Sequence, residues 1–144
     1  MGSSWGEQAS ISAAMVVVEK QMNSKILPQL RSLRRNYIGS VDTSLPVFPP
    51  QRAYGLDRRP WPPKLSESED LVLCHNDLST QNIFVDPGTF QIVGIIDWEF
   101  AGFFPPYFEL PLWREITWDG GRKMYEDARP RSLEFFGLKH EDLH

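Results

Sequence analysis

The chain has 144 residues, of which 41% are hydrophobic and 24% are charged, and its formal net charge is −4 at pH 7. These proportions are those of a soluble globular domain of ordinary size, so they exclude a fibrous repeat and wholesale disorder. The acidic balance also argues against nucleic acid as the main partner, because binding to phosphates requires a basic face.

The first predicted element is a long amphipathic helix over residues 8–35. Its apolar side chains recur at steps of three and four residues, at Ile11, Met15, Val18, Met22, Ile26 and Leu30. Pro28 interrupts this pattern, because proline removes a backbone donor and clashes with the preceding turn, so we expect a kink or a second helix starting there. The basic residues Arg31, Arg34 and Arg35 are interpreted as a solvated helix end, with a contact patch as the alternative.

A proline-rich segment follows over about residues 41–70. It contains six prolines, Pro46, Pro49, Pro50, Pro60, Pro62 and Pro63, so regular structure is not expected there. A segment of this length is either a functional surface loop or a poorly ordered insertion. Arg52, Arg58 and Arg59 are expected to be solvated, and contact with an anionic group is the alternative.

A buried strand and a β-hairpin are predicted beyond residue 70. Leu71–Cys74 is a short apolar run bounded by polar turn formers, which indicates a buried strand. Residues 83–85 and 91–96 flank Asp86-Pro87-Gly88-Thr89, a sequence typical of a tight hairpin connection.

The aromatic segment between residues 103 and 118 is predicted to form short packed helices. It contains Phe103, Phe104, Tyr107, Phe108, Trp113 and Trp118, interrupted by Pro105, Pro106 and Pro111. Most of these aromatic side chains are assigned to the core, and a partner interface is the alternative. Residues 122–136 are predicted to add one or two helical turns, which Pro130 divides.

Cellular location is predicted from cysteine usage and from the lack of targeting signals. The single cysteine, Cys74, lies in an apolar run and has no second cysteine with which to form an intramolecular disulfide. No apolar run is long enough to cross a membrane, and the N-terminus lacks the pattern of a secretory signal. We therefore expect a cytoplasmic protein with neither membrane nor nucleic acid as a partner.

The polar loop between the predicted strands, His75-Asn76-Asp77-Leu78-Ser79-Thr80-Gln81-Asn82, is the most informative segment. Phosphate transfer needs a carboxylate beside the attacking hydroxyl and oxygen ligands for magnesium, which Asp77 and Asn82 can provide. Asp97 follows where an apolar strand ends, and its carboxylate would hold magnesium across the phosphates. The alternatives are structural: a loop cap for Asp77, and hydrogen bonds within turns for Asn82 and Asp97.

These motifs resemble the catalytic core of the aminoglycoside phosphotransferase and choline kinase family, which is related to the protein kinases. The resemblance is specific over residues 71–104, where the histidine, aspartate and asparagine follow a strand and a hairpin leads to Ile96-Asp97-Trp98-Glu99. A weaker similarity to fungal members adds residues 30–34 and 38–42. Altogether the resemblance covers most of residues 10–118.

The resemblance implies a role for each residue of the motif. Asp77 matches the catalytic aspartate, which accepts or orients the proton of the substrate hydroxyl, and His75 matches a structural brace of the catalytic loop. Asn82 and Asp97 match the ligands of the magnesium that accompanies ATP, and Glu99 is a secondary candidate for metal. Asn76 departs from the glycine of many relatives, but asparagine tolerates unusual backbone angles.

The implied fold is α+β, namely the mainly helical C-terminal lobe of a kinase-like protein with a catalytic loop and a small β-hairpin. We expect one partial domain over residues 1–144, with its core at about 10–118. The N-terminal nucleotide lobe is expected to be absent, because no glycine-rich phosphate loop occurs. The segment from Gly2 to Gly6 with Lys20 imitates a phosphate loop and lysine, but helical spacing explains Lys20 better.

The motif residues, together with the expected absence of a nucleotide lobe, leave three possible functions. The first is a truncated ATP-dependent phosphotransferase acting on an unknown small-molecule hydroxyl, completed by a nucleotide lobe from elsewhere. The second is an inactive pseudokinase-like binding or regulatory module, whose uncovered face would take a protein partner. A metal-dependent hydrolase using His75, Asp77 and Asp97 is weaker, because no further cluster of histidine and carboxylate completes its site.

Overall fold

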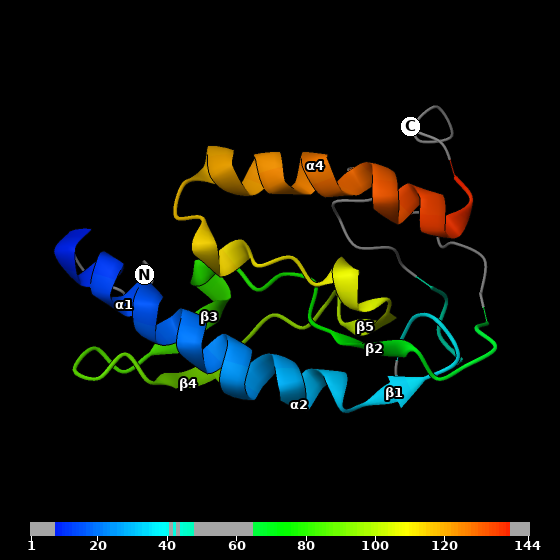
Figure 1. The fold of residues 1–144 in the computed structure, drawn as a ribbon, viewed down its shortest axis with the longest axis horizontal. Helices are drawn as coiled ribbons and strands as arrows, with labels where there is room; N and C mark the ends of the chain where they lie inside the picture. The colour runs from blue at the N-terminus through cyan, green and yellow to red at the C-terminus, as the bar shows by residue number, and fades with distance from the viewer. Residues whose placement is uncertain (1–7, 41, 43, 48–64, 139–144) are drawn as a thin grey trace.

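The computed structural model describes residues 8–40, 42, 44–47 and 65–138. The segments 41, 43 and 48–64, which contain most of the predicted proline-rich loop, lie outside these residues, as does the segment from Gly2 to Gly6. The structure contains two small antiparallel sheets, and its long C-terminal helix lies across the molecule from an N-terminal helical segment (Figure 1). Within the described ranges, no helix is both long and apolar enough to cross a membrane.

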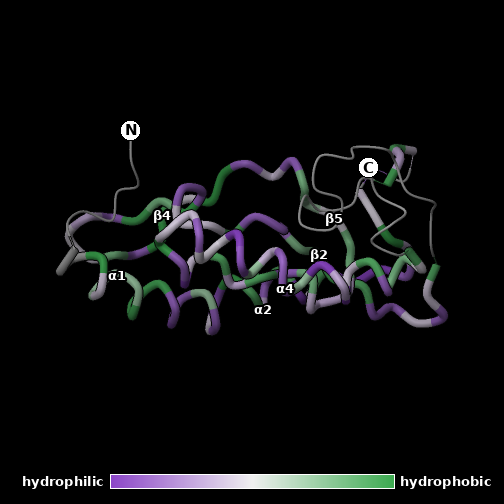
Figure 2. Tube along the Cα trace, turned by 90° about the horizontal axis from the view of Figure 1, so that it is seen from above, coloured by the Kyte–Doolittle hydropathy of each residue, from purple (hydrophilic) through white to green (hydrophobic). Residues whose placement is uncertain are grey.

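The N-terminal helical segment consists of α1 (Gln8–Gln21), a π-helical stretch (Met22–Ile26) and α2 (Leu27–Arg31). Pro28 lies in the first turn of α2, where its fixed φ suits the start of a helix, so the predicted second helix is confirmed. Figure 2 shows apolar and polar residues alternating along α1, as expected for a helix with one packed face.

A three-stranded antiparallel sheet has the order β1 (Arg34–Arg35), β2 (Leu71–Cys74) and β5 (Gly102–Phe104). The predicted buried strand is therefore confirmed as β2, and its residues Val72 and Leu73 lie opposite Phe104 and Phe103. Two predictions are wrong here: β1 replaces the expected helix end, and β5 replaces part of the expected short helices. In both cases pairing with β2 outweighs the local pattern, since it satisfies backbone groups that would otherwise be buried.

The predicted hairpin is confirmed by β3 (Ile83–Val85) and β4 (Ile92–Ile95), which pair with Ile83 opposite Ile95. Its turn is held by the Asp86 side chain, whose Oδ1 accepts hydrogen bonds from the N–H groups of Gly88 (2.8 Å) and Thr89 (3.2 Å). Local turn chemistry therefore sets the register that leads into the segment containing Asp97.

The C-terminal helix α4 (Trp118–Phe136) is continuous through Pro130, so the predicted division at this proline is wrong. Both helix ends are capped: the Thr117 hydroxyl accepts from the Gly120 N–H at 3.1 Å, and Gly137 ends the helix with φ of 70°. Packing of Leu133 and neighbouring aromatic side chains offsets the hydrogen bond lost at the proline.

Two buried clusters support the site. The first packs α1 against the hairpin and contains Ala14, Val18, Met22, Leu27, Leu78, Ile83, Val85 and Trp113. The second packs around the three-stranded sheet and contains Ile38, Val47, Leu71, Val72, Cys74, Phe103, Phe104 and Phe108. The assignment of most aromatic side chains to the core is confirmed, but Trp118 is 81% exposed. Turns of 3-10 helix at Pro106–Phe108 and Leu112–Arg114 connect β5 to α4.

Candidate active site

The loop after β2 is anchored by the carboxylate of Glu109. Its two oxygens accept hydrogen bonds from the backbone N–H groups of His75 (2.5 Å) and Asn76 (2.8 Å). Asn76 has φ of 70°, a left-handed angle that asparagine tolerates, and its side-chain amide donates to the carbonyl of Phe100 at 3.0 Å. The asparagine therefore fits a backbone conformation for which glycine is the usual choice.

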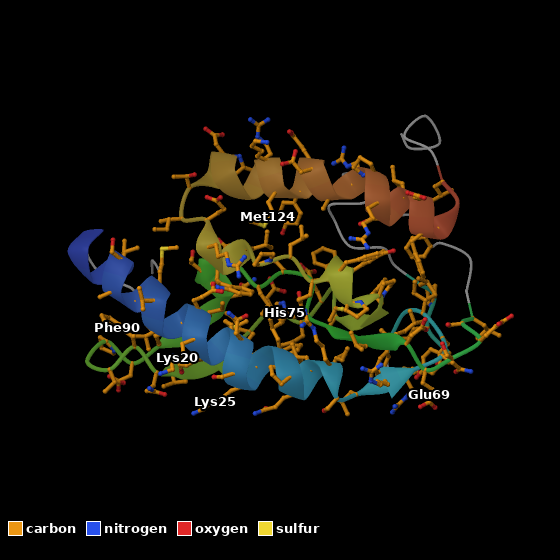
Figure 3. The ribbon with its side chains drawn as sticks, in the orientation of Figure 1. Lys20, Lys25, Glu69, His75, Phe90 and Met124 are labelled. Carbon is orange, nitrogen blue, oxygen red and sulfur yellow. The ribbon has the colours of Figure 1, made fainter. Side chains whose placement is uncertain are left out.

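His75 joins this loop to the end of the hairpin. Its ring is fully buried near the centre of the molecule, between the α1–α2 segment and α4 (Figure 3). Nδ1 accepts a hydrogen bond from the backbone N–H of Asp77 at 3.1 Å, so Nε2 carries the proton and donates to the carbonyl of Ile96 at 2.9 Å. Burial lowers the pKa of His75, which favours this neutral form.

Both carboxylate oxygens of Asp77 are held by side-chain donors. The Tyr125 hydroxyl donates to Oδ1 at 3.1 Å, and the Asn82 amide donates to Oδ2 at 3.1 Å and to the backbone carbonyl of Asp77 at 2.9 Å. Burial raises the pKa of Asp77, while the bonds from these two side chains oppose the shift. Each oxygen can still accept a second hydrogen bond, so the carboxylate remains able to bind another hydroxyl.

Asp97 lies close to this carboxylate. Its charge adds to the rise that burial causes in the pKa of Asp77 and opposes the fall that burial causes in the pKa of His75. The neighbouring Ile96 N–H donates to the backbone carbonyl of Asn82 at 2.9 Å. Asp97 is exposed and has φ of 61°, in the left-handed region. The structure therefore brings together the predicted site residues His75, Asp77, Asn82 and Asp97.

Glu99 is not tied to this group. It is exposed, and no hydrogen bond or ion pair in the described part of the chain joins it to Asp77, Asn82 or Asp97. Within the same described ranges, no cluster of three histidine, cysteine, aspartate or glutamate side chains is arranged to hold a metal ion. An amide and a carboxylate oxygen nevertheless form a hard donor pair suited to magnesium, which commonly keeps several water ligands.

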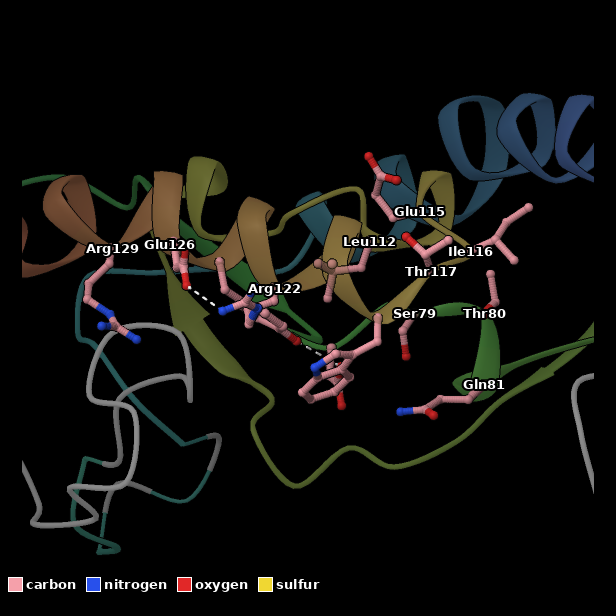
Figure 4. A pocket seen from close by; sticks show the side chains of 14 residues that line it. Ser79, Thr80, Gln81, Leu112, Glu115, Ile116, Thr117, Arg122, Glu126 and Arg129 are labelled. Atoms are coloured by element: carbon pink, nitrogen blue, oxygen red, sulfur yellow. Dashed lines mark hydrogen bonds and ion pairs between the residues drawn. The ribbon is translucent and has the colours of Figure 1, made fainter.

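A pocket of about 540 Å³ opens beside Asp77, between the loop after β2 and the first half of α4 (Figure 4). The loop lines it with Asp77, Ser79, Thr80 and Gln81, and the segment leading into α4 lines it with Leu112, Glu115, Ile116 and Thr117. The helix adds Trp118, Gly121, Arg122, Tyr125, Glu126 and Arg129. A small molecule bound here would contact the carboxylate of Asp77 directly.

Two contributors to the site were missed from the sequence. Glu109 lies 34 residues from His75, and Tyr125 lies 48 residues from Asp77. Each is a common residue in an unremarkable local context, so no motif or spacing indicates its contact. Only the tertiary arrangement of α4 and the turn at Pro106–Phe108 shows their roles.

Comparison with known proteins identifies the family that this chain resembles. The model of the phosphotransferase enzyme family matches residues 26–129. An aminoglycoside 3'-phosphotransferase of Streptomyces fradiae is 55% identical over 31 residues, which cover 22% of this chain and 12% of that protein. An aminoglycoside 3'-phosphotransferase of Streptomyces ribosidificus is 36% identical over 77 residues, which cover 53% of this chain and 29% of that protein. The chain thus spans less than a third of either relative, and no solved structure matches it.

Proposed function

We infer the function from the family to which the chain belongs, the phosphotransferase enzyme family. We propose that it takes part in transfer of the γ-phosphate of ATP to a hydroxyl of a small molecule in the cytoplasm. The observation that carries this proposal is the Asp77 carboxylate, held by Tyr125 and Asn82 on the wall of a pocket large enough for such an acceptor.

Asp77 is proposed as the base of this reaction. The acceptor oxygen forms a bond to the γ-phosphorus, the bond from that phosphorus to the bridging oxygen of ADP breaks, and the acceptor proton passes to Asp77. The burial that raises the pKa of Asp77 makes its carboxylate a stronger proton acceptor while it is ionised. Because Tyr125 and Asn82 hold both oxygens, the carboxylate is oriented before the acceptor binds.

Asn82 and Asp97 are proposed to hold magnesium with ATP, and Glu99 is a secondary candidate. The backbone hydrogen bond from Ile96 to Asn82 supports this pairing, because it links the two segments that carry the ligands. The Asn82 amide nitrogen faces Asp77, which leaves its side-chain oxygen as the atom for a cation. Magnesium in this position would offset the negative charge of the phosphates.

His75 is proposed as a structural brace and Glu109 as a second one. The neutral His75 ring connects the Asp77 backbone to Ile96, and Glu109 ties the start of the loop to the turn before α4. Neither side chain is placed to take the acceptor proton. Their proposed role is to hold Asp77 and Asp97 in register.

We further propose that the chain corresponds to the C-terminal lobe of a kinase-like fold, as a truncated, fungal-type member of the family. A separate lobe, from a protein partner or from additional sequence, would then hold the nucleotide. In support, the sequence lacks a glycine-rich phosphate loop, and the matched stretches cover only 12% and 29% of the two relatives.

A binding or regulatory module without turnover is the second candidate. The side chains of Val93, Ile96 and Trp98 are 68%, 48% and 43% exposed along β4 and the segment after it. Exposed apolar side chains grouped in this way suit a surface that a protein partner covers.

The test is transfer from γ-labelled ATP with magnesium to kanamycin, choline, homoserine and myo-inositol, together with calorimetric titration of ATP. We expect Asp77→Asn to lower transfer by about 10²- to 10⁴-fold and Asp97→Ala to weaken magnesium-dependent ATP binding. Asp70→Asn, in the exposed loop before β2, is the matched control. ATP binding without turnover would favour the second candidate, and unchanged transfer by Asp77→Asn would refute the proposed base.

A further inference from the structure

Among the described lining residues, the pocket beside Asp77 has nearly balanced charge. Three carboxylates, those of Asp77, Glu115 and Glu126, face two guanidinium groups, those of Arg122 and Arg129. Arg122 lies 3.5 Å from Glu126, so these two charges offset each other. An acceptor with several ammonium groups would lose their hydration in the pocket and would need several unpaired carboxylates in its place. This lining has only one more carboxylate than it has guanidinium groups.

The carboxylate of Glu115 lies at the start of α4. A Cβ placed on Gly120, in the first turn of α4, would collide with the Glu115 carboxylate, so this carboxylate lies directly against the N-terminal turn of the helix. The positive end of a helix dipole favours a negative side chain there. Glu115 is therefore partly compensated by the helix, and the two other charges of the lining, those of Asp77 and Arg129, are opposite in sign.

Ser79 brings a buried hydroxyl to the same pocket. Its Oγ has no hydrogen-bond partner among the described residues, although buried polar atoms are nearly always paired. The Ser79 N–H donates to the backbone carbonyl of Asp77 at 2.8 Å, so the two residues belong to one tight turn. A ligand hydroxyl suits this oxygen because it can donate or accept, whereas an ammonium group can only donate.

The pocket also offers an apolar surface. Trp118 and Ile116 line it and are 81% and 47% exposed, which is unusual for side chains of their size. Figure 4 shows Ser79, Thr80 and Gln81 on one side and Arg122 and Glu126 on the other. The pocket thus combines hydroxyl-binding groups near Asp77 with an indole that can stack on a carbon ring.

We propose that the acceptor is an uncharged cyclic polyol, with one hydroxyl on Asp77, a neighbouring hydroxyl paired with Ser79, and its carbon face against Trp118. This inference rests on the proposed phosphate transfer and names the substrate class of the same site. It differs from the acceptor in the names of the two relatives, because aminoglycosides carry several ammonium groups.

The test is equilibrium binding to the full chain in the absence of nucleotide, by saturation-transfer NMR and calorimetry. The probes are myo-inositol, a neutral cyclic polyol, and kanamycin, a polycationic amino sugar. We expect myo-inositol to bind more tightly than kanamycin at physiological ionic strength, and Ser79→Ala to weaken myo-inositol binding about fivefold. Ser68→Ala, exposed in the loop before β2, should leave this affinity unchanged.

Two further readouts separate a binding role from a structural one. Ser79→Ala removes an unpaired buried hydroxyl, so its melting temperature should equal or exceed that of the wild type. Trp118→Ala should weaken myo-inositol binding about fivefold, and Trp118→Phe should retain most of it because the aromatic face remains. Tighter binding of kanamycin, unchanged affinity in Ser79→Ala, or loss of stability in that variant would each overturn the inference.

The result of the myo-inositol binding test can be told apart from the result of the phosphate-transfer test. Transfer from ATP to another alcohol without binding of myo-inositol would overturn the polyol inference and support phosphate transfer. Binding of myo-inositol together with transfer from ATP that Asp77→Asn leaves unchanged would support the pocket assignment and count against the proposed reaction.

Discussion

Substitution of Glu109 by glutamine perturbs the anchor of the loop that carries the proposed base, while preserving side-chain size. The carboxylate accepts from two backbone N–H groups, those of His75 and Asn76, at 2.5 and 2.8 Å. A glutamine side chain has one acceptor oxygen, and its NH₂ group would face the other N–H. One hydrogen bond to a charged group is thereby lost and the other weakened, so we expect a loss of about 2–3 kcal/mol in the free energy of unfolding.

Urea denaturation followed by tryptophan fluorescence measures this loss. For a domain of this length, about 2–3 kcal/mol corresponds to a fall of roughly 6–12 °C in melting temperature. Amide hydrogen exchange gives a local readout, because the N–H groups of His75 and Asn76 should lose protection in Glu109→Gln. Glu67→Gln, at an exposed position before β2, is the matched control. Equal stability and unchanged protection of the two amides would refute the anchoring role.

Three other substitutions test separate contacts. Tyr125→Phe removes one donor to the proposed base and should lower transfer about fivefold with less than about 1 kcal/mol change in stability, measured by kinetics and urea denaturation. Glu19 has its pKa lowered from 4.5 to about 2, chiefly by the hydrogen bond from Arg114. Its stabilising contribution is therefore complete above pH 4.5 and is lost as the pH falls to about 2. Because about a third of the side chain is exposed, Glu19→Gln should lower the free energy of unfolding by only about 1 kcal/mol at pH 7, and it should have no effect near pH 2. Urea denaturation at the two pH values measures both. Gly102→Ala places a Cβ 2.6 Å from a backbone carbonyl oxygen and should lower the melting temperature, whereas Gly121→Ala, with open space around it, should not.

Local patterns were sufficient to predict the elements that carry the proposed catalytic residues. The apolar run Leu71–Cys74 and the turn sequence at Asp86 each determine their own structure within a few residues. The loop between strand and hairpin follows directly, so His75, Asp77 and Asn82 could be grouped before the structure was known. Asp97 joins them because the hairpin returns the chain to the same place.

The remaining features depend on contacts that are distant in the sequence. The strand β1 has two residues and β5 has three, and both exist because they pair with β2. The helix α4 continues through Pro130 because caps at both ends and packed aromatic side chains outweigh one lost hydrogen bond. Neither effect can be read from local propensity.

Dependence on distant contacts also explains why the pocket beside Asp77 was not predicted from the sequence. The sequence indicated the proposed base and the proposed metal ligands, whose types are set by the chemistry of phosphate transfer. It gave no sign of Tyr125, or of the pocket that α4 forms with Ser79, because these contacts require a helix more than 35 residues away to pack over the loop. Variable packing of this kind is how one catalytic core can serve different acceptors.

The most direct test of the account is single-turnover phosphate transfer with the chain in excess over γ-labelled ATP, in the presence of magnesium and a hydroxyl acceptor. We predict that Asp77→Asn transfers phosphate about 10²- to 10⁴-fold more slowly than the wild type, and that Asp70→Asn matches the wild type. Product formed at the same rate by Asp77→Asn would contradict the central role of this carboxylate.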